Sequence, residues 1–143
     1  GNQVPLDEEF ELCNKYLNIE KLRLGKRLDV QWDIRAVPKE VMIPLLTLQP
    51  LLENAVLHGV QPLPQGGIVE IRASYSHGVF ELTITNPYVE KEADVESGGN
   101  RMALENTRNR LAALYGDRAK LTGYAEGNRY ITRLSYPYPV KTG

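Results

Sequence analysis

The chain has 143 residues, a length that suits a single domain with one hydrophobic core. Its 17 Lys and Arg nearly balance its 18 Asp and Glu, so the charge gives no footprint for direct binding to nucleic acid or an anionic membrane. No apolar run approaches the roughly 18–20 residues that span a bilayer, and no signal peptide opens the chain. Because the chain begins at Gly1 without an initiator Met, we expect a domain of a longer protein.

The first expected element is a helix from Pro5 to about Leu24. Acidic residues fill its first turn, and Gly25 fits just past its end. One apolar stripe recurs every three or four residues, at Leu6, Phe10, Cys13 and Leu17. Cys13 is the only cysteine, which excludes an internal disulfide and a cysteine-based zinc site. A one-faced strand is predicted next, from Leu28 to Ile34.

A second helix is predicted from about Val41 or Pro44 to His58. It carries Glu53 and Asn54 inside an apolar run. A buried polar group without a hydrogen bond costs roughly 2–7 kcal/mol, so these side chains need partners. A bound cation with phosphate oxygens is one candidate, because Mg²⁺ accepts few protein oxygens and keeps waters and phosphates as its other ligands. A helix edge that points both side chains into solvent is the other interpretation.

The remaining pattern predicts two hairpins around a third helix. The first hairpin is expected to have strands at 68–75 and 79–85. A loop over 86–101, with two glycines near its end, then leads to a helix from about Met102. The second hairpin is expected to have strands at 119–125 and 130–136. The helix should bury Leu104, Thr107, Leu111 and Leu114. The element order is not a regular βαβ alternation. It predicts an α+β two-layer sandwich, with a mixed, mostly antiparallel sheet and helices on one face.

Several phrases in this order resemble a known family. The pattern is similar to the GHKL ATPase (Bergerat) fold and, within it, to the catalytic domains of LytS/YehU-type sensor histidine kinases, most of all the AlgZ (FimS) kind. The phrases are Val4-Pro-Leu-Asp-Glu-Glu9, Tyr16-Leu-Asn-Ile-Glu-Lys-Leu-Arg23, Leu48-Gln-Pro-Leu-Leu-Glu-Asn-Ala55 with His58-Gly59, and Ala103-Leu-Glu-Asn-Thr-Arg-Asn-Arg-Leu111 with Leu114-Tyr-Gly116. The resemblance implies that residues 1–25 lead to a dimerisation and phosphoacceptor region outside this chain, and that residues 26–143 form the ATP-binding catalytic domain.

The resemblance also implies roles on the second helix, with ATP and Mg²⁺ as cofactors. Asn54 matches the asparagine that holds Mg²⁺ between the ATP phosphates, and an amide oxygen is a suitable hard, neutral ligand. Glu53 either orients a metal-bound water or is structural, since neighbouring helix residues point in different directions. His58, four residues after Asn54, either reaches a phosphate or is only a satisfied polar residue.

Further positions follow from the same resemblance. Asn86 stands where relatives carry an Asp that accepts a hydrogen bond from the adenine amino group, although a strand-end Asn that starts a turn is an equal alternative. Two glycines before a helix let backbone N–H groups approach phosphate. The alternative interpretation is that these glycines only end the loop. Arg101, and in addition either Asn106 or Arg108, are expected to point at the phosphates. The residues implied at the nucleotide are Asn86, Gly98, Gly99, Arg101, Met102, Leu104 and Asn106.

The chain departs from the family pattern at four places. Leu57 stands where a Lys or Arg is usual, and Asn86-Pro87-Tyr88 replaces an acidic phrase with glycines. Arg101 occupies the place of a second glycine, and Pro50 that of a catalytic base of some GHKL ATPases, which disfavours direct ATP hydrolysis. These departures make the ATP site atypical.

The expected function is transfer of the ATP γ-phosphoryl group to a histidine on the upstream helix, for relay to a response regulator, with a LytTR-type regulator suggested. The expected location is the cytoplasmic side of an inner-membrane-anchored receptor. Without the acceptor histidine, we expect no autophosphorylation by the chain alone. The alternative is a degenerate GHKL domain that binds nucleotide poorly and acts as an interaction scaffold.

Overall fold

The computed structural model describes residues 3–89 and 97–141, with the backbone alone for 97–101. Its elements are, in chain order, β1 (Gln3–Pro5), α1 (Leu6–Leu24), the 3-10 turn η1 (Gly25–Arg27), β2 (Leu28–Ile34), β3 (Met42–Pro44), α2 (Leu48–Asn54), the π-helical segment η2 (Ala55–Val60), β4 (Gly67–Ser76), β5 (Val79–Pro87), α3 (Ser97–Tyr115), the 3-10 turn η3 (Gly116–Arg118), β6 (Lys120–Glu126) and β7 (Arg129–Pro137).

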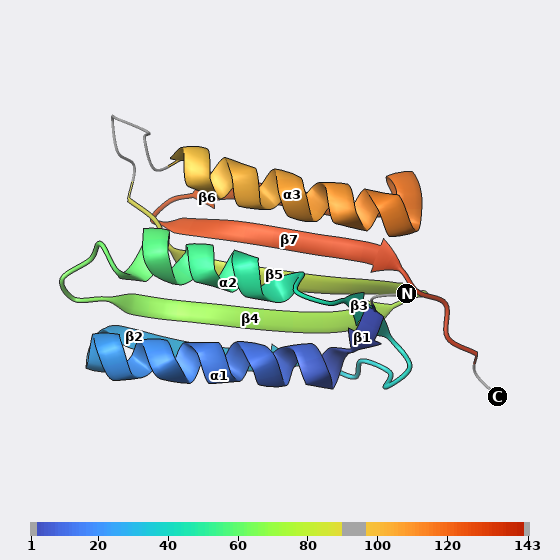
Figure 1. Cartoon of the computed structure of the whole chain (residues 1–143), viewed down its shortest axis with the longest axis horizontal. Helices are drawn as coiled ribbons and strands as arrows, with labels where there is room; N and C mark the ends of the chain where they lie inside the picture. The colour runs from blue at the N-terminus through green and yellow to red at the C-terminus, as the bar shows by residue number, and fades with distance from the viewer. Residues whose placement is uncertain (1–2, 90–96, 142–143) are drawn as a thin grey trace.

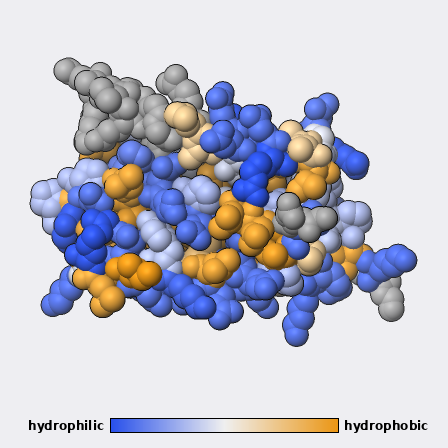
Figure 2. Space-filling view, in the orientation of Figure 1, coloured by the Kyte–Doolittle hydropathy of each residue, from blue (hydrophilic) through white to orange (hydrophobic). Residues whose placement is uncertain are grey.

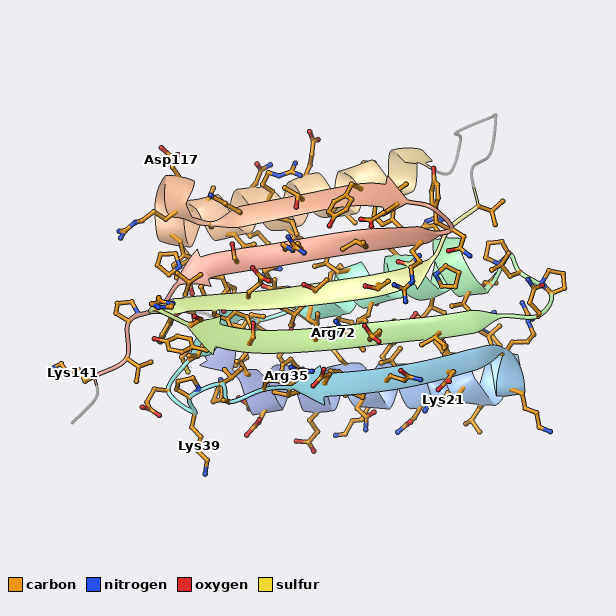
Figure 3. All side chains as sticks on the ribbon, turned by 180° about the vertical axis from the view of Figure 1, so that it is seen from behind. Lys21, Arg35, Lys39, Arg72, Asp117 and Lys141 are labelled. Carbon is orange, nitrogen blue, oxygen red and sulfur yellow. The ribbon has the colours of Figure 1, made fainter. Side chains whose placement is uncertain are left out.

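A five-stranded sheet in the order β2-β4-β5-β7-β6 supports the three helices. Only β2 and β4 are parallel, and the other neighbours are antiparallel. α1, α2 and α3 lie side by side on one face, with α2 in the middle (Figure 1). The opposite face carries charged side chains such as Arg35 and Arg72, and Arg72 pairs with Glu70 at 2.8 Å (Figure 3). The predicted α+β two-layer sandwich is confirmed.

The core lies between the helices and the sheet. β5 alternates strictly, and its helix-facing residues Phe80, Leu82 and Ile84 are buried. The predicted stripe of α1 is confirmed, since Leu6, Cys13 and Leu17 are buried in the same core and Phe10 packs on Trp32 with ring centroids 5.5 Å apart. Within residues 3–89 and 97–141, none of the helices combines the length and the apolar character that a bilayer crossing requires.

The second helix begins later than predicted. Residues 42–44 form β3, which pairs antiparallel with β1, and α2 starts only at Leu48. Strand pairing satisfies the backbone of Met42–Pro44, so this stretch does not need a helix. The predicted start near Val41 or Pro44 was wrong, because a three-residue strand is specified by a partner almost 40 residues away.

The third helix differs from the prediction at both ends. α3 begins at Ser97, not near Met102, because each added residue gains a backbone hydrogen bond once a helix exists. At its other end Leu114 is 50% exposed, so its predicted burial was wrong. The buried seam runs through Thr107 and Leu111 to Tyr115, whose ring stacks on Tyr136 at 4.4 Å.

Candidate functional site

Most residues singled out in the sequence lie at one end of the molecule. α2 ends at Asn54 and continues into η2, which carries His58, while β5 ends just after Asn86. α3 starts at this same end and runs back over the sheet in the opposite direction to α2 (Figure 1). The topology therefore brings Asn54, His58, Asn86 and the first turns of α3 to one end of the layer of helices.

The helix changes its winding directly after Asn54. In η2 the N–H of Gln61 donates to the carbonyl of Val56 at 2.8 Å, a five-residue step. Such π-helical turns are rare and occur frequently at functional sites. The side chains of Asn54 and His58 are both half-buried, so part of each stays accessible.

Asn86 is packed against η2. Its side chain is 7% exposed, and its Nδ2 donates to the carbonyl of Pro87 at 2.7 Å. A Cβ on Gly59 would lie 2.4 Å from that Nδ2, so only glycine fits there. The sequence analysis did not give Gly59 a role, although its place next to His58 in the family phrase was a signal. The Asn86–Gly59 contact joins the end of β5 to the helix that carries Asn54.

Glu53 lies on a different side of α2 from Asn54. Gln49 Nε2 donates to its carboxylate at 3.1 Å. Burial raises the pKa of Tyr16 on α1 to about 12, and the negative charges of Glu20 and Glu53 add to that shift. Glu53 therefore faces α1, about 100° around the helix from Asn54. The structure does not bring it together with Asn54, and its role toward a metal-bound water stays a prediction.

The described residues at the start of α3 differ in their surroundings. Met102 is 65% exposed and Asn106 is exposed, whereas Leu104 is half-buried beside Gly123. Arg108 is held away, because its Nε and one terminal nitrogen both donate to the carbonyl of Leu121, at 3.0 and 2.9 Å. The expectation that Arg108 points at phosphates was therefore wrong.

Gly98 and Gly99 lie inside the first turn of α3, not in the loop before it. They remain at a helix N-terminus, where backbone N–H groups lack intrahelical partners. The side chain of Arg101 and residues 90–96 of the predicted loop lie outside the described residues.

Tyr88, in the stretch that replaces the family phrase with glycines, pairs with an aromatic residue of β7. Tyr130 is the register partner of Asn86 on β7, and the rings of Tyr88 and Tyr130 lie 5.8 Å apart. The N–H of Tyr88 donates to the carbonyl of Asn128 at 2.8 Å, which fixes the chain as it leaves β5. Burial raises the pKa of Tyr130, so its phenol stays neutral at physiological pH.

A separate hollow lies away from these residues. It has a volume of about 270 Å³ and is lined by Val4, Glu8, Glu11, Leu12, Lys15 and Leu45. On the helix side of the molecule, hydrophobic side chains gather near the N-terminus within a mostly hydrophilic surface (Figure 2). The hollow contains none of the predicted site residues.

Two curated relatives match almost the whole chain. The sensor histidine kinase YesM of Bacillus subtilis is 30% identical over 140 residues, which cover 96% of this chain and 24% of that protein. The sensor protein LytS of Staphylococcus haemolyticus is 28% identical over 152 residues, which cover 99% of this chain and 26% of that protein. This chain is therefore similar to one part of these sensor histidine kinases. It spans about a quarter of the length of these relatives.

Solved histidine kinases share the fold of this chain. The catalytic domain of ThkA has a TM-score of 0.68 at 12% identity, with 94% of each chain covered. The structure of ThkA in complex with the response regulator TrrA has a TM-score of 0.65 at 11% identity. The match covers 96% of this chain and 41% of that one. The structure of ShkA in complex with AMPPNP has a TM-score of 0.65 at 20% identity, and the match covers 99% of this chain and 32% of that one. No family model matches the chain. The finer resemblance to the AlgZ kind stays a prediction.

Proposed function

We propose that this chain binds ATP with Mg²⁺ and is the catalytic domain that phosphorylates a histidine of its own receptor. The observation that carries the proposal is the convergence of Asn54, Asn86 and the N-terminus of α3 at one end of a histidine kinase fold. The donor set fits a nucleotide with its metal. A half-buried amide oxygen on Asn54 suits a hard cation whose other ligands are phosphates and waters.

Each group has a distinct task in this proposal. Asn54 holds the Mg²⁺, which neutralises phosphate charge when bound, and His58 on the next turn faces the phosphates. The Asn86 amide oxygen accepts from the adenine amino group, because its Nδ2 already donates to Pro87. Backbone N–H groups of the first turn of α3, at Gly98 and Gly99, meet phosphate oxygens. Met102, Leu104 and Asn106 border the nucleotide, and Arg101 supplies a cation.

Catalysis by such a domain is mainly positioning and charge stabilisation, as in phosphoryl transfer generally. The acceptor is a histidine on a dimerisation helix outside this chain, so the chain alone forms no phosphohistidine. ThkA was solved with a response regulator and ShkA with AMPPNP, which supports a regulator and a nucleotide as partners here. The LytTR type of the regulator, the division at residue 25 and a membrane anchor elsewhere in the receptor are parts of the same proposal.

A calorimetric titration with AMPPNP, with and without Mg²⁺, tests the proposal. We expect micromolar to sub-millimolar binding that needs Mg²⁺, and its loss in Asn54→Asp, where a carboxylate would repel the phosphates. Asn18→Asp, an exposed substitution of the same kind on α1, is the matched control and should bind as the wild type does. A folded chain that binds nothing at millimolar nucleotide would refute the proposal and favour the scaffold alternative.

A further inference from the structure

The loop that starts α2 is held by α1 through a buried carboxylate. Glu9 on α1 is fully buried, and its two oxygens accept from the N–H groups of Leu46 at 3.2 Å and Leu48 at 2.9 Å. A carboxylate at a helix N-terminus satisfies donors that have no intrahelical partner and interacts favourably with the helix dipole. Glu9 therefore fixes where α2 begins.

The same loop is held by α3 from the other side. Arg110 donates from one terminal nitrogen to the carbonyl of Leu46 at 2.8 Å and from the other to the carbonyl of Leu45. The two terminal nitrogens of a guanidinium form a fixed fork, so this pair of bonds sets the direction of the loop as well as its distance from α3. We call Glu9, Arg110 and the held residues 45–48 the α2 clamp.

Leu46, at the centre of the α2 clamp, has a strained backbone. Its φ is +62°, a left-handed conformation that a branched, bulky residue rarely adopts. Such a residue persists only where its surroundings fix it, and here both its N–H and its carbonyl are held by side chains from other helices. Residues with such strained backbones cluster at sites where geometry matters for function.

We propose that Glu9 and Arg110 are positioning residues, through which α1 and α3 together set the placement of α2 and hence of Asn54. The inference rests on the proposed role of Asn54 as the Mg²⁺ ligand. Asn54 follows Leu48 by six residues on one helix, about 9 Å along its axis, so a shift of the first turn moves Asn54 with it. Neither residue touches the nucleotide in this scheme.

The test uses Arg110, because its side chain is exposed and its removal leaves the core intact. AMPPNP dissociation constants are measured with and without Mg²⁺ for wild type, Arg110→Ala, Arg110→Lys and the control Arg118→Ala, an exposed arginine just beyond α3. We expect Arg110→Ala to lower the Mg²⁺-dependent gain in affinity about tenfold, with Mg²⁺-free binding little changed. Arg110→Lys cannot form the fork, so its Mg²⁺-dependent gain should lie between those of Arg110→Ala and the wild type. Arg118→Ala should show the same gain as the wild type.

An unchanged Mg²⁺-dependent gain in Arg110→Ala would overturn the proposal, as would an equal loss with and without the metal. Amide exchange gives a second readout without nucleotide. The N–H groups of Leu46 and Leu48 should exchange at least about tenfold faster in Arg110→Ala, and unchanged rates would also refute the clamp. If the wild type shows no Mg²⁺-dependent binding, the proposed function fails, while exchange still decides whether Arg110 holds the loop.

Discussion

Gly59 and Asn86 depend on each other although they lie on different elements. The amide of Asn86 fills the space that a side chain on Gly59 would need, and it also donates to Pro87. This mutual fit explains why the turn after Asn54 carries a glycine at 59 in spite of its poor helix propensity. It also holds the Asn86 amide nitrogen on Pro87, which leaves the amide oxygen for the proposed contact with the base.

We predict that Gly59→Ala destabilises the chain by about 1–3 kcal/mol, because the new methyl group overpacks a filled site. Urea denaturation of Gly59→Ala, Asn86→Ala and the double variant measures the coupling. Gly59→Ala should cost clearly less when Asn86 is already Ala, since the nearest clashing atoms are gone. Equal costs in the two backgrounds would show that the contact does not govern Gly59.

At the scale of elements, α2 depends on a cap that comes from another helix. Glu9→Gln keeps the side-chain volume but leaves one acceptor oxygen in place of two. We expect the free energy of unfolding to fall by about 1.5–3 kcal/mol, the range for hydrogen bonds to charged groups. Glu8→Gln, on the exposed side of the same turn, should change stability by less than about 0.5 kcal/mol. Equal effects in urea denaturation would contradict the assignment of Glu9 as the cap.

Elements with a local signal could be predicted from the sequence, whereas long-range contacts could not. β2 was predicted with the bounds that the structure has, because Leu28, Val30 and Trp32 alternate with polar residues. β3 was missed because its pairing with β1 has no local pattern. The Glu9 cap was missed for the same reason. Acidic residues in the first turn of a helix are equally compatible with side chains that all point into solvent. In the site, Asn54 and Asn86 followed from motifs, but the packing of Asn86 on Gly59 needed the fold.

At the scale of the whole molecule, one buried thiol and several buried or half-buried phenols predict instability at high pH. Burial, and then the negative charges of Glu9 and Glu53, raise the pKa of Cys13 from 9.0 to about 12. Burial, with smaller charge effects, raises that of Tyr16 and Tyr115 from 10.0 to about 12 and that of Tyr136 further. These groups lose protons first in the unfolded chain, so the stability they provide is complete below about pH 9 and is lost as pH rises toward 12.

Urea midpoints at pH 8, 9.5 and 11 check this expectation. Each such group steepens the fall in unfolding free energy by up to about 1.4 kcal/mol per pH unit. Tyr16→Phe keeps the ring and removes one titrating proton, so its pH dependence should be shallower than that of the wild type. A stability that stays flat to pH 11 would contradict the burial of these groups.

Under the proposed function, a Mg²⁺-nucleotide binds where α2, β5 and α3 meet. Backbone amide NMR of the chain, recorded as AMPPNP with Mg²⁺ is added, locates the bound nucleotide. We expect chemical-shift changes concentrated at residues 54–60, 86–88 and 102–106, with the hairpin turn around His77 at the opposite end unaffected. Shifts confined to the hollow around Leu12 and Leu45, or none at saturating nucleotide, would contradict it.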